Sequence, residues 1–186
     1  MIRNFKLLTI ITGLITGLVV SNSRAENLTP HQIMTYMQIK LEKGISQNVL
    51  SGFRDIVERL DLDGNGQLNL DEYARNSHFR GNPRGTRGFF GAADTNRDEQ
   101  MSLNEYAWQR IITDEARTIF FAMDSDRDRH VSRKEFLQNK IVNSKATAEK
   151  IFIAFDTDES GDLSLPEYLR KWSRWARNGR KFGSLY

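Results

Sequence analysis

Acidic side chains recur along this 186-residue chain in four twelve-residue segments that share one pattern. Each segment has aspartate at position 1, aspartate or asparagine at position 3, an oxygen-bearing side chain at position 5 and glutamate at position 12. A hard dication takes about six to eight oxygen ligands, which carboxylates at such short spacing can supply. The pattern predicts four divalent-cation sites, named loops one to four: 61–72, 94–105, 124–135 and 156–167.

Apolar residues flank every loop at helical spacing. Four residues before each loop stand Val57, Phe90, Phe120 and Phe152, and directly after its glutamate stand Tyr73, Tyr106, Phe136 and Tyr168. Apolar positions three and four residues apart mark one face of a helix. Each unit of the repeat is therefore predicted to be helix, loop, helix, and the chain is predicted to be all-α.

The four units together resemble the EF-hand superfamily of calmodulin-like proteins over residues 46–177. The resemblance implies Ca²⁺ as the cofactor, because a glutamate that binds through both oxygens suits Ca²⁺ better than the tighter octahedron of Mg²⁺. It also implies these ligands at loop positions 1, 3, 5, 7 and 12: Asp61, Asp63, Asn65, Gln67 and Glu72; Asp94, Asn96, Asp98, Gln100 and Glu105; Asp124, Asp126, Asp128, His130 and Glu135; Asp156, Asp158, Ser160, Asp162 and Glu167. The position 7 ligand is expected to be the backbone carbonyl.

The resemblance further implies that loops pair through short antiparallel β contacts at their apolar position 8, which is Leu68, Met101, Val131 or Leu163. We expect one EF-hand pair over 46–112 and a second over 113–177, with a junction near Arg110 to Glu115. No Pro-rich or Gly-rich linker separates the pairs, so a compact body is expected instead of a dumbbell.

The four loops are not equal at position 6, where the backbone is expected to turn through positive φ. Loops one and four have Gly66 and Gly161 there, whereas loops two and three have Glu99 and Arg129. A side chain in this conformation costs about 1 to 2 kcal/mol. All four loops are expected to bind, loops one and four most tightly. The alternative is that loops two and three are kept only for folding, loop three above all because four basic residues surround its ligands: Arg127, Arg129, Arg133 and Lys134.

The first 25 residues have the features of a signal peptide. Arg3 and Lys6 precede a 14-residue apolar or weakly polar stretch, and small residues surround Arg24 at the expected cleavage point after Ala25. That stretch is shorter than the ~20 residues of a membrane-spanning helix, so a permanent anchor is the weaker hypothesis. We expect a secreted or periplasmic protein. The leader holds three of the 27 basic residues and none of the 24 acidic ones, so the remaining chain is balanced in charge, and it has no cysteine.

Two segments outside the repeat have patterns of their own. In 26–45, Thr29 and Pro30 predict a helix start, followed by an apolar stripe that Gly44 ends: Ile33, Met34, Met37 and Leu41. This helix either packs on the EF-hand body or occupies a target groove, and packing is favoured. The segment Arg80 to Gly85 is expected to be a loop.

The C-terminal region is basic and aromatic, and residues 178–186 are expected to form a basic tail. Such a segment can contact an anionic membrane surface. However, Tyr168, Trp172 and Trp175 also have the spacing of a core-facing helix stripe, which is the favoured interpretation.

No catalytic motif or nucleic-acid-binding pattern accompanies the loops, so neither an enzyme nor a nucleic-acid partner is expected. The leading hypothesis is a Ca²⁺ sensor that changes shape and engages a protein target. The alternative is a calcium buffer or calcium-stabilised structural protein. Only four methionines follow the leader, so the adaptable Met-rich groove of a promiscuous sensor is not evident.

Overall fold

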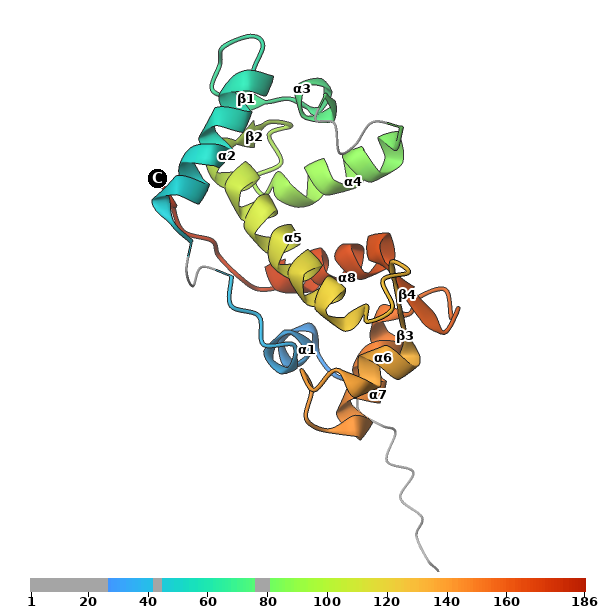
Figure 1. The fold of residues 1–186 in the computed structure, drawn as a ribbon. Helices are drawn as coiled ribbons and strands as arrows, with labels where there is room; N and C mark the ends of the chain where they lie inside the picture. The colour runs from blue at the N-terminus through green and yellow to red at the C-terminus, as the bar shows by residue number, and fades with distance from the viewer. Residues whose placement is uncertain (1–26, 42–44, 76–80) are drawn as a thin grey trace, which may run out of the picture.

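The computed structural model describes residues 27–41, 45–75 and 81–186 (Figure 1). The predicted leader and Gly44 lie outside this part of the chain. The described helices are α1 (Pro30–Tyr36), α2 (Gln47–Leu60), α3 (Leu70–Ala74), α4 (Pro83–Ala93), α5 (Leu103–Met123), α6 (Arg133–Gln138), α7 (Lys145–Phe155) and α8 (Leu165–Arg177). The strands are β1 (Gln67–Leu68), β2 (Met101–Ser102), β3 (His130–Ser132) and β4 (Asp162–Ser164).

The four loops associate in two pairs, each through a short antiparallel ladder. β1 pairs with β2, which places Leu68 opposite Met101, and β3 pairs with β4, which places Val131 opposite Leu163. All four of these side chains are fully buried. The expected contact at position 8 is therefore present between loops one and two and between loops three and four.

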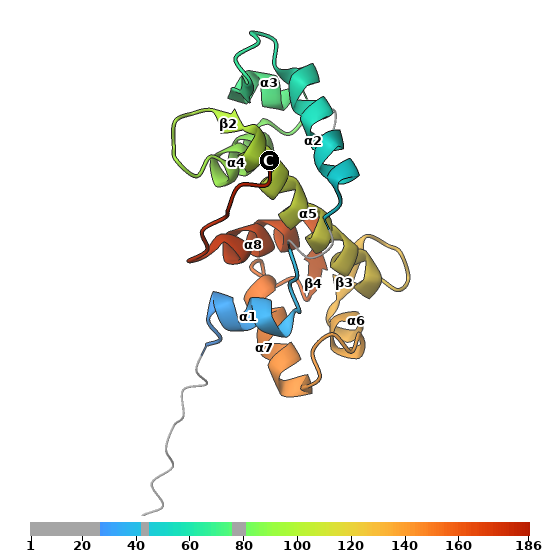
Figure 2. The same cartoon turned by 90° about the vertical axis from the view of Figure 1, so that its left-hand side faces the viewer.

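Helix α5 connects the two halves of the molecule without a break. It follows loop two and precedes loop three, and its 21 residues include neither proline nor glycine, so nothing in the sequence ends it. The junction predicted near Arg110 to Glu115 lies inside this helix. Figures 1 and 2 show α2, α3 and α4 around one end of α5, and α6 and α7 at the other.

Helix α8 supplies the aromatic centre of the second half. Tyr168 and Trp172 are fully buried and Trp175 is 9 % exposed, which confirms the core-facing interpretation of this stripe. The Tyr168 ring stacks on Phe155 of α7 at 4.6 Å between centroids, and Trp175 meets the same ring edge-on at 4.7 Å. Offset and edge-to-face contacts of this kind add to the burial of the rings.

Helix α1 packs against α8 with its whole apolar stripe buried. The helix is shorter than the predicted 26–45 segment, because the backbone turns through positive φ at Gln38 (58°) and Leu41 (47°). The carboxylate of Glu115 on α5 stabilises this turn by accepting hydrogen bonds from the backbone N–H groups of Lys40 (2.6 Å) and Leu41 (3.0 Å). Met37 and Leu41 thus reach the core from a turn and not from a helix.

Helix α4 begins earlier than expected. The segment from Arg80 to Gly85 was predicted to be a loop, but the helix starts at Pro83. Asn82 caps it by accepting a hydrogen bond from the Gly85 N–H at 2.8 Å, and proline is well suited to a first helical position. Arg80 lies outside the described residues.

The end of α8 is tied to α5 by a buried polar contact. The guanidinium of Arg177 donates to Ser173 Oγ at 2.8 Å and to Oε1 of Gln109, which is 2 % exposed. Burial lowers the pKa of Arg177 to about 10. Beyond Arg177 the chain runs back along α5 to α2 (Figures 1 and 2). None of the helices described here has the length and apolar character needed to span a membrane.

Candidate metal-binding loops

All four loops are closed by the same backbone hydrogen bond. The N–H of position 6 donates to Oδ2 of the position 1 aspartate, at 2.7 Å in loop one, 3.1 Å in loops two and three, and 3.0 Å in loop four. Position 6 has positive φ in every loop, whether it is Gly66, Gly161, Glu99 or Arg129. The expected left-handed turn is therefore present even where glycine is missing.

Position 4 has the same conformation, which the sequence analysis did not anticipate. Gly64 occupies it in loop one, but Arg97, Arg127 and Glu159 occupy it in the others, with φ between 57° and 64°. Each loop thus contains two left-handed residues, and loops two and three use a side-chain-bearing residue at both.

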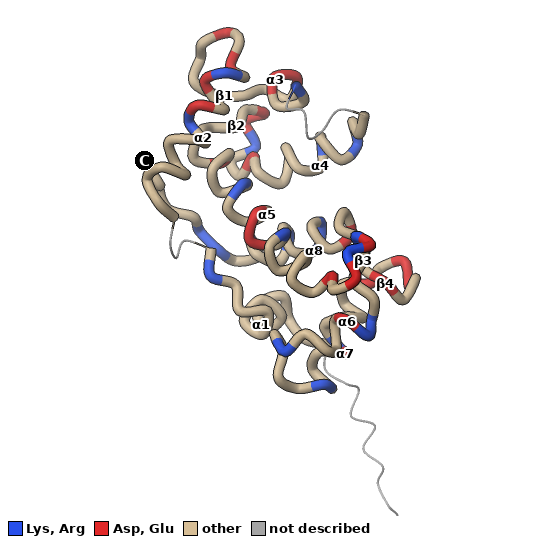
Figure 3. The backbone as a smooth tube through the Cα atoms, viewed as in Figure 1, with Lys and Arg blue, Asp and Glu red and all other residues tan. Residues whose placement is uncertain are grey.

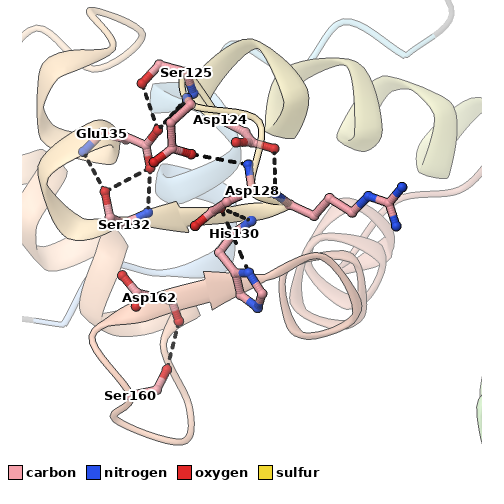
Figure 4. A network of polar contacts seen from close by, with 10 residues as sticks. Asp124, Ser125, Asp128, His130, Ser132, Glu135, Ser160 and Asp162 are labelled. Atoms are coloured by element: carbon pink, nitrogen blue, oxygen red, sulfur yellow. Dashed lines mark hydrogen bonds and ion pairs between the residues drawn. The ribbon is translucent and has the colours of Figure 1, made fainter.

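The glutamate at position 12 is folded back over each loop. Its Oε1 accepts a hydrogen bond from the backbone N–H of position 2, at 2.7 to 2.8 Å in all four loops. In loops one to three its Oε2 accepts from the N–H of position 9, at 2.9 to 3.0 Å. Figure 4 shows Glu135 held in this way between Ser125 and Ser132. The carboxylate is therefore positioned before any ion binds.

Position 9 is the N-cap of the following helix, a role that the sequence analysis did not assign to it. Asn69, Ser102 and Ser132 are N-caps whose side chains accept from the N–H of the glutamate three residues later, and that glutamate bonds back to the cap. This reciprocal arrangement is a capping box. Its Ser-x-x-Glu or Asn-x-x-Glu signature is visible in the sequence and could have revealed it.

The predicted aspartates and glutamates are brought together in three of the four loops. Their carboxylate oxygens lie within 4.8 Å of one another in three groups: Asp61, Asp63 and Glu72; Asp124, Asp126 and Asp128; Asp156, Asp158 and Glu167. Glu135 is not part of the second group, although its oxygens accept from Ser125 and Ser132 as those of Glu72 accept from Leu62 and Asn69. In loop two the residues Asp94, Asp98 and Glu105 do not form such a group. Figure 3 shows acidic residues concentrated in the loops after α2 and before β4.

The polar residues at positions 3, 5 and 7 bind within their own loops. Asn65 Oδ1 accepts from the Gln67 N–H at 2.8 Å, and the Asn96 amide donates to Asp98 at 2.8 Å. Ser160 Oγ donates to the carbonyl of Asp162 at 2.8 Å. Position 7 lies in or beside a strand in each loop: Gln67, Gln100, His130 and Asp162. The His130 imidazole is exposed, and its Nδ1 lies 3.9 Å from Oδ1 of Asp128. Figure 4 shows these two side chains next to each other.

Hydrogen bonds keep several of these carboxylates ionised. The bonds from the backbone of Asn69 and Leu62 lower the pKa of Glu72, and the bond from Gly66 lowers the pKa of Asp61. Burial opposes ionisation of Glu135, but bonds from Ser125 and Ser132 outweigh it and lower its pKa to about 2. These groups are negatively charged at neutral pH.

Among the predicted ligands in the described second half, two buried carboxylate oxygens lack a hydrogen-bond partner. Asp124 Oδ1 and Glu167 Oε2 belong to residues that are each 5 % exposed, and neither oxygen is hydrogen-bonded. Burying a charged oxygen is costly unless another charge compensates it. A dication in loops three and four fits this requirement, with Asp124 and Glu167 among the residues that would hold it.

Part of the basic charge of loop three is paired or exposed to solvent. Arg133 forms an ion pair with Glu149 on α7. Arg127 and Arg129 are exposed at the two left-handed positions. The repulsion of a dication by loop three is therefore weaker than the four basic residues in its sequence indicate.

Residues 113–173 match the family model of the EF-hand domain pair. No curated protein matches the chain. The matched segment contains loops three and four with the helices between them, and it ends within α8. An EF-hand domain pair with these acidic clusters fits Ca²⁺ binding. Loops one and two lie outside the match.

Proposed function

We propose that the protein binds Ca²⁺ through all four loops, including the two outside the family match. The observation that carries this proposal is the geometry shared by the four loops. Each has the bond from position 6 to the aspartate at position 1, and each has its glutamate folded onto position 2. In loops one to three the glutamate also takes part in the capping box, but its second bond, to position 2, carries the carboxylate across the loop to the residue next to the position 1 aspartate.

Loops one and four are proposed as the tightest sites. Both bring an aspartate pair and the final glutamate into one group, and both have glycine at position 6. Loop two is proposed as the weakest, because its carboxylates are not gathered and its left-handed positions are Arg97 and Glu99.

We propose a calcium-stabilised or buffering protein in place of the sensor expected from the sequence, and the burial of α1 supports this choice. A sensor must expose an apolar surface when it binds metal. In this protein, helix α1 would have to leave the second half to expose the apolar surface beneath it. Its side chains Ile33 and Met34 are buried there, with at most 2 % of their surface exposed. Removing them from the core would expose a large apolar area, which costs about 25 cal/mol per Å².

A sensor remains the second candidate because of one apolar cleft. It has a volume of about 460 Å³ between the α1–α2 connection and α5, and its lining includes Met37, Leu41, Phe53, Ile111 and Ile119. Movement of residues 37–41 away from α5 would enlarge this cleft into a groove for an apolar segment of a protein target.

The first experiment counts the sites by calorimetry with the chain lacking residues 1–25. Glu72→Gln, Glu105→Gln, Glu135→Gln and Glu167→Gln should each remove or strongly weaken one site, because each loses an oxygen that binds the ion. Glu99→Gln and Glu159→Gln are matched controls, since these glutamates lie in loops two and four at non-ligand positions. An unchanged isotherm for any position 12 variant would show that its loop does not bind.

The second experiment separates the two modes of action. Ca²⁺ is added while the melting temperature and the fluorescence of a hydrophobic dye are followed. We expect the melting temperature to rise, because an ion that binds only the folded state stabilises it. Dye binding should stay constant. Dye fluorescence that rises with Ca²⁺ would support the sensor instead.

We further propose that residues 1–25 direct export and are removed, so that the protein acts outside the cytoplasm. N-terminal sequencing of protein recovered from the periplasm or medium should begin at Glu26. We propose no catalytic role and no nucleic-acid partner. Membrane contact through the C-terminal segment is not favoured, because Trp172 and Trp175 are buried in the core.

A further inference from the structure

The last five residues of the chain, Phe182 to Tyr186, dock onto the first half of the molecule. The Trp108 indole N–H donates to the Gly183 carbonyl at 2.9 Å, and the centroids of the Phe182 and Trp108 rings lie 4.6 Å apart. The Tyr186 hydroxyl donates to the Leu50 carbonyl at 2.9 Å. The C-terminal segment thus forms specific contacts far from α8, from which it emerges.

These contacts join two particular helices. Trp108 lies on α5, just after loop two, and Leu50 lies on α2, which leads into loop one. Arg54 of α2 also lies over the Tyr186 ring at 5.2 Å. None of the hydrogen bonds of these five residues in the described structure involves α3 or α4. The segment therefore links α2 to α5.

The C-terminal segment Phe182–Tyr186 also binds the residue next to a predicted calcium ligand. Asn104 immediately precedes Glu105, and both the nitrogen and the oxygen of its side-chain amide are hydrogen-bonded to the segment. It donates to the Gly183 carbonyl at 3.2 Å, and its Oδ1 accepts from the Leu185 N–H at 2.9 Å. The first turn of α5, which carries Glu105 over loop two, is thereby fixed in place.

We propose that the C-terminal segment Phe182–Tyr186 is a positioning element for loop two, so that its docking and Ca²⁺ binding at Glu105 strengthen each other. The proposal rests on the proposed function of loop two as a Ca²⁺ site. The direction of the coupling follows from the geometry. Glu105 already bonds to Thr95 at 2.8 Å and to the Ser102 N–H at 3.0 Å while the segment is docked. Fixing the turn that carries Glu105 reduces the entropy lost when an ion binds.

Loop two is the site where such support matters most. It lacks glycine at positions 4 and 6, and its carboxylates are not gathered into one group. Coupling between two sites is reciprocal, so Ca²⁺ at loop two should also hold the segment in place.

The test compares the chain from Glu26 to Tyr186 with a deletion of residues 182–186, by calcium calorimetry and by hydrogen exchange. A second variant, Phe182→Ala with Tyr186→Phe, removes the ring contact and the bond to Leu50 while keeping full length. The control, Arg180→Lys with Lys181→Arg, changes the neighbouring side chains but keeps their charges and all of these contacts. Each is made with and without Glu105→Gln, which gives a double-mutant cycle.

We expect the deletion to weaken one site about fivefold, the full-length variant to weaken it less, and the control to leave the isotherm unchanged. In the Glu105→Gln background the deletion should have no effect on the remaining sites. Without calcium, the deletion should accelerate amide exchange in the first turns of α5.

Three outcomes would overturn the inference: equal isotherms for the deletion and the parent, an equal loss when Glu105 is already replaced, or unchanged exchange in the calcium-free deletion protein. Failure of the proposed function is a different result. If the parent chain binds no Ca²⁺ at loop two, the Glu105→Gln variant and the parent chain give the same isotherm. The mutual strengthening would then be wrong, and the exchange measurement would still decide whether the segment braces α5.

Discussion

The backbone N–H of Glu99 donates to Oδ2 of Asp94 at 3.1 Å, the same bond that Gly66 makes with Asp61 at 2.7 Å. The two residues also share a left-handed backbone, with φ of 62° for Glu99 and 81° for Gly66. Loop two therefore adopts the geometry of loop one despite a residue that is strained in it. The strain is a cost that substitution can relieve.

Replacing the non-glycine residue at position 6 of loop three should stabilise the calcium-free protein. Arg129→Gly removes a side chain from a backbone with φ of 72° that the loop already adopts without an ion, so the free energy of unfolding of the calcium-free protein should rise by up to about 1 to 2 kcal/mol. Unfolding in urea without Ca²⁺ measures the change. Arg129→Gln is the control, because it removes the charge but keeps a side chain at positive φ. If both variants gain equally, the lost charge and not the relieved strain explains the gain.

Removing a bonded helix cap should destabilise the calcium-free protein. Ser102 and Ser132 each accept a hydrogen bond from the N–H of their loop's glutamate, whereas Ser164 makes no such bond. Ser102→Ala and Ser132→Ala should each lower the free energy of unfolding by about 1 kcal/mol. Ser164→Ala should cost clearly less in the same urea titration. Equal losses at all three serines would contradict the role assigned to the caps.

The aromatic cluster around α8 should dominate the stability of the second half. Phe155 is fully buried between Tyr168 and Trp175, whereas Ile153 on the same helix is 63 % exposed. Phe155→Ala should lower the free energy of unfolding by about 3 to 5 kcal/mol. Ile153→Ala should change it by less than about 0.5 kcal/mol. Similar effects at the two positions, measured by denaturant unfolding, would place Phe155 outside the core.

Helix α1 should behave as part of the core and not as a detachable segment. Met34 is 1 % exposed and Tyr36 is 44 % exposed. Met34→Ala should therefore cost about 2 to 5 kcal/mol of unfolding free energy, and Tyr36→Ala much less. The sensor hypothesis predicts that Ca²⁺ releases α1 from the core. In calcium-saturated protein, Met34→Ala would then hardly change the free energy of unfolding.

The local features of the loops were accessible from the sequence because they depend on short-range geometry. Aspartate at position 1 and glutamate at position 12 are close in the chain, and the apolar residue between them must point to the partner loop. The left-handed residue at position 6 was expected for the same reason. Arg97 and Arg127 at position 4 were missed, because nothing in their side chains signals a conformation imposed by the loop as a whole.

Helix limits and long-range contacts were less accessible. The segment after Tyr36 has helical periodicity, yet Glu115, far away in sequence, binds its backbone and stabilises a turn. The C-terminal tail looked like a solvated basic segment, because its charges are prominent. Its docking depends on Trp108 and Leu50, whose positions come from the packing of α2 on α5.

By itself the sequence determined the four acidic loops, their helical flanks and the apolar position through which they pair, because each depends on residues within a few turns of one another. Only the tertiary structure decided that α1 joins the core of the second half and that the C-terminus contacts the first. These outcomes depend on which surfaces meet once the helices are packed, and no spacing along the chain encodes that choice locally.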